Sequence, residues 1–139
     1  MAISFNFVKT KDVISQKNKI KSWIKNVVEQ KGKSIGDISY IFCDDEYLLE
    51  INKTYLEHDF FTDIITFDYS DKEKIAGDLF ISIDRVRENS LTHNENFEKE
   101  LHRVIIHGIL HLLGLKDKTE KQAKQMRKAE EECLRSLML

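Results

Sequence analysis

The amino-acid sequence predicts an α/β (α+β) fold: one domain over residues 1–139, in which a mixed sheet of about four strands is covered by helices. Its length suits one domain, and 41% apolar with 33% charged residues allows a substantial core. The chain contains no proline and no Gly/Ser-rich stretch that would mark a linker. Strand-like and helix-like segments alternate before a long helical end, which is typical of a sheet covered by helices.

The first part of the chain is expected to alternate strands and helices. Apolar and polar residues alternate over residues 3–7, which predicts a half-buried strand. A long amphipathic helix is expected over residues 15–32, with Ser15 as its N-cap and Gly32 at its end. A second strand is predicted over residues 38–43, and Asp44 can cap the helix that follows. One side of that helix carries Leu48, Ile51 and Tyr55.

Two further strands are predicted in the middle of the chain. Residues 64–69 and 78–83 are rich in β-branched and aromatic side chains. The short polar stretch at residues 70–74 predicts a hairpin between them. A strand, a helix and a strand in succession, followed by a hairpin, give a mixed sheet.

After Asp84 the chain is expected to form three helical pieces, with a polar interruption around residues 89–96 and a stop at Gly114. The middle piece, about residues 98–113, is apolar around much of its circumference, which indicates a buried central helix. The last helix starts near Thr119. The side chains that it is expected to turn toward the body are Ala123, Met126, Ala129 and Cys133.

Composition excludes several classes of protein. The 22 Lys and Arg against 24 Asp and Glu argue against binding nucleic acid through bulk positive charge, and no binding to DNA is expected. The longest apolar runs are far shorter than the roughly 20 residues that a membrane helix requires. Residues 1–11 lack the apolar stretch of a secretory signal, so a cytoplasmic location is expected. Cys43 and Cys133 stand in no paired motif and are expected to be buried thiols.

The predicted central helix carries a candidate metal site. His107 and His111 are four residues apart, so their imidazoles share one face of a helix and can bind a single ion. Gly114 would end the helix and let the chain return Asp117 toward the same point. The alternative is that the two histidines hydrogen-bond to backbone or carboxylate groups and that Asp117 helps to cap the last helix.

Two histidines and one carboxylate would leave an open position on a zinc ion, which is typical of catalytic sites. Water at that position would have a pKa lowered to about 7, so hydrolysis is the expected reaction class. Beyond this metal-bound water, the residues identify no catalytic side chain.

Residues 107–117 closely resemble the H-G-x-L-H-L-x-G-x-x-H signature of the YbeY family of bacterial endoribonucleases. Upstream, the chain resembles the family's N-x-x-Y-R-x-x-D-x-x-T-D-V-L-S-F segment at Asn52, Tyr55, Asp59, Thr62 and Asp63. Residues 77–82 resemble its G-D-I-x-I-S strand. The resemblance implies a metal-dependent endoribonuclease that cuts single-stranded RNA in ribosomal RNA maturation and ribosome quality control. It also implies ribosomal RNA, and ribosomal or assembly proteins, as partners, with no role for a membrane.

Two departures from the family pattern affect the chemistry. Asp117 stands where the family usually has a third histidine; zinc is the expected ion, but an oxygen ligand also suits Mn²⁺ or another divalent ion. Leu56 replaces the arginine after the tyrosine, so either another cation binds phosphate or the site holds RNA less firmly. Arg103, one helical turn before His107, is the predicted substitute, although an ion pair with Glu100 is an alternative.

Several residues allow two interpretations. Thr62 and Asp63 could line the metal cleft and bind substrate, or could serve a turn or cap. Gly108 could let substrate approach the helix or let the helix pack closely on a neighbour. His58, His93 and His102 are expected to be surface or locally hydrogen-bonded histidines. Lysines crowd the last helix and could follow a phosphate backbone or form a solvated face; they are Lys118, Lys121, Lys124 and Lys128.

Two alternative functions remain open. The first is a ribosome-assembly factor in which the metal stabilises the fold. The second is a metalloprotease, which Gly108 disfavours because the H-E-x-x-H motif would place its glutamate base there.

Overall fold

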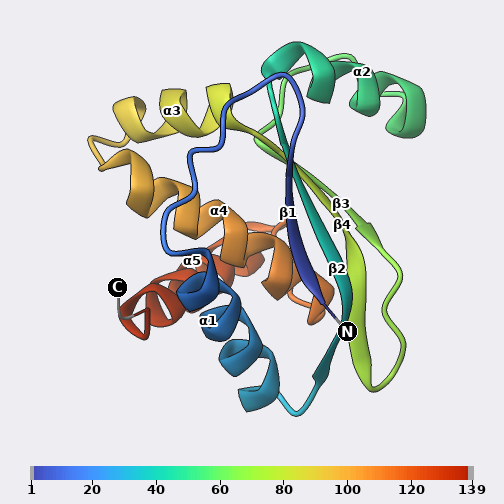
Figure 1. The fold of residues 1–139 in the computed structure, drawn as a ribbon, viewed down its shortest axis with the longest axis vertical. Coiled ribbons are helices and arrows are strands. Elements are labelled where there is room, and N and C mark those ends of the chain that lie inside the picture. Colours follow the sequence, from blue (N-terminus) through green and yellow to red (C-terminus); the bar gives the residue numbers. More distant parts are fainter. Residues whose placement is uncertain (1, 138–139) are drawn as a thin grey trace.

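The computed structural model describes residues 2–137, which form one four-stranded sheet and five helices (Figure 1). The strands are β1 (Ile3–Phe7), β2 (Ser34–Cys43), β3 (Ile64–Asp68) and β4 (Lys74–Ser82). The helices are α1 (Lys17–Gln30), α2 (Asp45–Leu56), α3 (Ile83–Thr92), α4 (Phe97–Leu112) and α5 (Glu120–Arg135). Among residues 2–137 there is no helix with the length and apolar character needed to cross a membrane.

The sheet is mixed, as predicted. Its strand order is β1-β2-β4-β3, with β1, β2 and β4 parallel and β3 antiparallel to β4 at one edge. Ile64 pairs with Ile81, so β3 begins beside the carboxyl end of β4. The segment before β3 therefore lies at the edge of the sheet where α/β proteins commonly bind ligands.

Helix α4 is the central helix of the fold, which confirms the prediction of a buried helix. It lies on the same side of the sheet as α1 and α5 (Figure 1). Ile105, Ile106 and Ile109 are fully buried and belong to the main core between the helices and the sheet. A smaller core lies under α2 on the other face and contains Cys43, Leu48 and Ile65.

Several predicted boundaries were wrong by a few residues. Helix α1 begins at Lys17 with Gln16 as its N-cap, one residue after the predicted Ser15. Strand β2 starts at Ser34 rather than at residue 38, because its first residues pair with β4 across a bulge. Helix α3 continues to Thr92, through part of the predicted interruption, and the Asn89 side chain is held there by a hydrogen bond to Asp63.

Some predictions of which side chains face the body were also wrong. Tyr55, predicted on the same side of α2 as Leu48, is 64% exposed, whereas Leu48 is buried. On α5, Met126 is buried as predicted and Cys133 is half-buried, but Ala123 is exposed. The side chain that takes a buried place on α5 is the charged Glu130. This buried carboxylate lies against His107 of α4.

Candidate metal centre and cavity

Helix α4 has well-defined ends, and these position the site. The Asn96 side chain accepts a hydrogen bond from the Lys99 backbone N–H at 2.9 Å and caps the start. At the other end Gly114 has φ +105°, a left-handed conformation that glycine adopts without strain. Its N–H bonds to the His111 carbonyl. The chain turns back here and brings Asp117 beside the two histidines.

Gly108 lets α4 lie directly on the sheet. A Cβ atom at this position would be 2.2 Å from Leu79 Cδ2 and 2.9 Å from Ile64 Cδ1, which is too close for any real contact. Of the two roles considered for Gly108, the structure therefore supports close packing. Because the glycine face of α4 rests on β3 and β4, the position of His107 relative to the edge strand is tightly constrained.

Three ligand atoms converge beside the last turns of α4. The Nε2 atoms of His107 and His111 are 3.0 Å apart, and each lies 3.4 Å from Asp117 Oδ2. Metal–ligand bonds of about 2.0–2.1 Å in tetrahedral geometry place neighbouring ligand atoms about 3.3–3.4 Å apart. His107, His111 and Asp117 therefore have the donor types and the spacing that fit one divalent ion.

The hydrogen bonds of the two Nδ1 atoms leave each Nε2 atom available to bind a metal ion. His111 Nδ1 lies 3.0 Å from the Leu115 carbonyl oxygen, which only accepts, so Nδ1 donates. His107 Nδ1 lies 2.6 Å from Oε2 of Glu130. In neutral rings, both Nε2 atoms then carry lone pairs that face each other and have no proton to share. A cation between them would satisfy both.

The electrostatic surroundings of His107 are strongly negative. Burial alone would lower its pKa, but the hydrogen bond and charge of Glu130, together with the charges of Asp63 and Asp117, raise the pKa above its ordinary value. Negative charge gathered around an imidazole pair favours any cation at this point.

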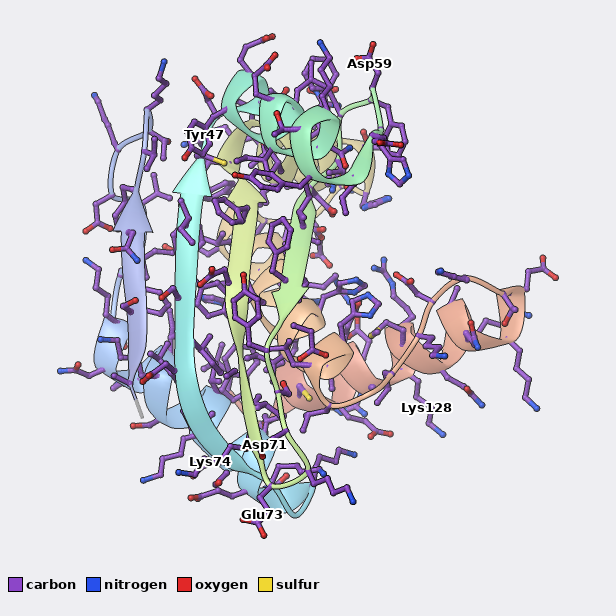
Figure 2. All side chains as sticks on the ribbon, turned by 90° about the vertical axis from the view of Figure 1, so that its right-hand side faces the viewer. Tyr47, Asp59, Asp71, Glu73, Lys74 and Lys128 are labelled. Atoms are coloured by element: carbon purple, nitrogen blue, oxygen red, sulfur yellow. The ribbon has the colours of Figure 1, made fainter. Side chains whose placement is uncertain are left out.

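The three ligand atoms open into a cavity of about 810 Å³, within the usual size range of ligand sites. One wall is formed by residues from 52 to 68, which include the end of α2, the segment before β3 and β3 itself. The other wall is formed by the end of α4 and residues 114–118. In Figure 2 the segment with Asp59 lies at the top, while α5, which carries Lys128, projects below it.

Thr62 and Asp63 both line this cavity. The Asp63 carboxylate accepts a hydrogen bond from the Asn89 amide at 3.1 Å, and burial raises the pKa of Asp63. Thr62 has its hydroxyl 3.5 Å from the Ile64 carbonyl, which is a weak contact, so this hydroxyl can turn to another partner. Leu56 also lines the cavity, where it offers no charge.

Arg103 is not brought to the cavity. Its side chain is 5% exposed and ion-paired with carboxylates of α4 and α5: Glu131 at 2.6 Å, Glu130 at 3.4 Å and Glu100 at 3.5 Å. The predicted alternative, an ion pair with Glu100, is therefore present. The cations that do line the cavity are Lys116 and Lys118, in the segment after α4.

Sequence reasoning missed three contributors to the site. Glu130 follows Met126 by four residues, so its helical spacing could have placed it on the inner face of α5. His58 and Phe60 line the cavity with rings stacked at 5.1 Å, although His58 had been given no role. Away from the cavity, His102 is not at the surface but buried beside Trp23, with ring centroids 6.2 Å apart.

Comparisons with known proteins agree with the sequence motifs. The family model described as Endoribonuclease YbeY matches residues 5–138. A protein named Endoribonuclease YbeY from Porphyromonas gingivalis is 57% identical over 112 residues, 81% of this chain and 74% of that protein. One from Bacteroides thetaiotaomicron is 47% identical and covers 96% of this chain and 98% of its own length. A solution structure of a Thermotoga maritima protein superposes with a TM-score of 0.65 at 25% identity, covering 93% of this chain and 88% of that one.

Proposed function

The chain belongs to the YbeY endoribonuclease family, and from this premise we propose that it cuts single-stranded RNA in the cavity beside His107, His111 and Asp117. The observation that carries the proposal is the convergence of two Nε2 atoms and one carboxylate oxygen at the wall of that cavity. Two imidazoles and one carboxylate leave a coordination position open, which is what a hydrolytic site needs and a closed structural site lacks.

The proposed ion is zinc, with Mn²⁺ or another divalent ion as the alternative because Asp117 supplies oxygen. When bound, such an ion polarises a phosphoryl oxygen and lowers the pKa of water toward 7. The chain's own contribution is to keep the Nδ1 protons of the two neutral rings on their hydrogen-bond partners, so that both Nε2 lone pairs face one point. Metal analysis of the purified protein identifies the ion, and Asp117→His is expected to shift its preference from Mn²⁺ toward zinc.

Substrate binding is proposed to use both walls of the cavity. Lys116 and Lys118 take the phosphate-binding role that Leu56 cannot perform, since the guanidinium of Arg103 is occupied by the carboxylates of α5. Thr62 and Asp63 lie on the opposite wall and offer polar contacts to the ribose and phosphate.

Preference for unpaired RNA is proposed to come from Phe60, which is 55% exposed in the cavity wall and stacked on His58. An exposed ring of this kind can stack on a nucleobase that is free of a duplex, which contributes about 1–3 kcal/mol per base. Phe61 is a matched control, because it is 47% exposed but contacts the Arg85 guanidinium instead. Phe60→Ala is expected to raise KM for a single-stranded oligonucleotide about tenfold or more, and Phe61→Ala to leave it nearly unchanged.

The test of the function is His111→Ala. Circular dichroism monitors the fold, metal analysis the bound ion, and a labelled single-stranded ribosomal RNA fragment the cleavage. The proposal expects a folded variant with lost metal and at least a hundredfold slower cleavage. A folded variant that cuts as fast as the parent refutes it and favours an assembly factor with a structural metal. Cleavage of an unstructured peptide but not of RNA by the parent would favour a metalloprotease.

In the cell, the proposed substrate is ribosomal RNA during its maturation and quality control, in the cytoplasm, with ribosomal or assembly proteins as partners. The family membership supports an RNA substrate. Depletion of the protein followed by mapping of ribosomal RNA ends tests the finer statement.

A further inference from the structure

Glu130 is a carboxylate buried inside the molecule and aimed at a predicted metal ligand. It lies on α5, is 5% exposed, and has Oε2 at 2.6 Å from Nδ1 of His107. Burying a carboxylate is costly unless it is paired and hydrogen-bonded. The fold keeps this charge inside, in direct contact with the ring, where an apolar side chain would have completed the packing of α5.

The contact determines which nitrogen of His107 can bind an ion. An ionised carboxylate only accepts hydrogen bonds, so Nδ1 carries the proton and donates it to Glu130. In the neutral ring Nε2 then carries the lone pair and faces His111 Nε2 and Asp117 Oδ2. The same hydrogen bond restricts rotation of the ring, so the donor atom keeps its direction.

Glu130 is itself held in place from α4. Its second oxygen, Oε1, is 3.4 Å from Arg103 Nη1 and 3.7 Å from Arg127 Nη1. Arg103 is further anchored by Glu131 at 2.6 Å. Arg103 thus contacts the Glu130 oxygen that the imidazole does not, and ion pairs and one hydrogen bond connect α4 and α5 up to His107.

Resting on the proposed function, we propose that Glu130 is a positioning residue for the metal centre: it fixes the tautomer and orientation of His107, and Arg103 holds it in place. A carboxylate on the far nitrogen of a metal-binding histidine makes the ring a stronger donor, and loss of such a partner typically weakens metal binding 10- to 100-fold. Helix α5 therefore contributes to the metal centre without supplying one of the three ligands.

The test compares Glu130→Gln with Glu131→Gln. Both remove one carboxylate from Arg103, but only Glu130 contacts the imidazole. Affinity for Zn²⁺ and Mn²⁺ is measured by chelator competition, and the tautomer of His107 by ¹⁵N NMR of the metal-free protein. We expect Glu130→Gln to weaken metal binding 10- to 100-fold and to lower the fraction of the Nδ1–H tautomer. Glu131→Gln should stay within about twofold of the parent.

Glu130→Asp covers the case in which the glutamine variant does not fold. It keeps the charge that Arg103 needs but withdraws the oxygens from the ring, so it is also expected to bind metal at least tenfold more weakly. Unchanged affinity and tautomer in a folded Glu130 variant, or equal losses in the Glu131 control, would overturn the inference. A parent protein that binds neither ion would instead show that the proposed function is wrong, and the positioning role would be refuted with it.

Discussion

Gly108→Ala is expected to lower the free energy of unfolding by about 1–2 kcal/mol, although alanine is the better helix former. The new Cβ would lie 2.2 Å from Leu79 Cδ2, whereas carbon atoms in contact are separated by about 3.5–4.0 Å. Leu79 is fully buried, so its methyl has little room to move. An overlap this large belongs in the upper part of the overpacking range, about 2–3 kcal/mol. Removing a helical glycine returns up to about 1 kcal/mol.

A double-mutant cycle with Leu79→Ala tests the reasoning. Alone, Leu79→Ala removes a buried side chain and should cost about 2–5 kcal/mol. In that background Gly108→Ala no longer meets the Leu79 methyl and approaches only Ile64 Cδ1, the end of a half-buried side chain that can turn away, so its own cost should fall sharply. Urea unfolding followed by circular dichroism gives the four free energies. If Gly108→Ala costs the same in both backgrounds, or stabilises the parent, close packing is not the reason for this glycine.

Three further outcomes are expected. Burial lowers the pKa of His102 despite the opposing charge of Glu98, so the folded state favours the neutral ring. The contribution of this ring to the free energy of unfolding is therefore complete above its ordinary pKa of about 6.5. It is lost as the pH falls toward the lower pKa of the folded state. His102→Leu should therefore lose less unfolding free energy than the parent between pH 7 and pH 5 in urea titrations; equal losses contradict this. Burial raises the pKa of Cys43 to about 12, so iodoacetamide at pH 8 should modify it only after unfolding, as read by mass spectrometry; rapid labelling of the native protein would contradict the burial. Tyr40→Phe removes a 2.8 Å buried hydrogen bond to the Ile105 carbonyl and should cost about 1 kcal/mol in urea unfolding; no measurable change would mean that the bond contributes nothing.

The parts of the fold that could be predicted are those that the periodicity of apolar and polar residues within one segment indicates. Alternation over residues 3–7 and the apolar circumference of residues 98–113 determined a strand and a buried helix, and the structure contains both. The spacing of His107 and His111 placed two imidazoles on one helical face, and the structure brings their Nε2 atoms to 3.0 Å. Each of these signals depends only on backbone periodicity, which neighbouring residues in the sequence specify.

Contacts between helices could not be predicted in the same way. Whether Glu130 lies in solvent or inside depends on how α5 crosses α4, and that crossing is decided by packing between residues about 25 apart in sequence. A glutamate on an amphipathic helix is ordinarily a surface residue, so the residue type alone would place Glu130 in solvent. The ion pair with Arg103 and the hydrogen bond with His107 explain why its burial is tolerated.

The prediction for Arg103 shows why a shared helical face is not enough. Arg103, His107 and His111 lie on one face of α4, but their side chains are 5%, 19% and 29% exposed in that order. Exposure rises along the helix because α5 covers its earlier turns and leaves its last turn beside the cavity. The place of Arg103 therefore suits a buried charge that anchors α5, whereas His107 contacts both α5 and the cavity. The proposed phosphate-binding residues, Lys116 and Lys118, lie beyond His111, where the chain has left the helix and lines the cavity.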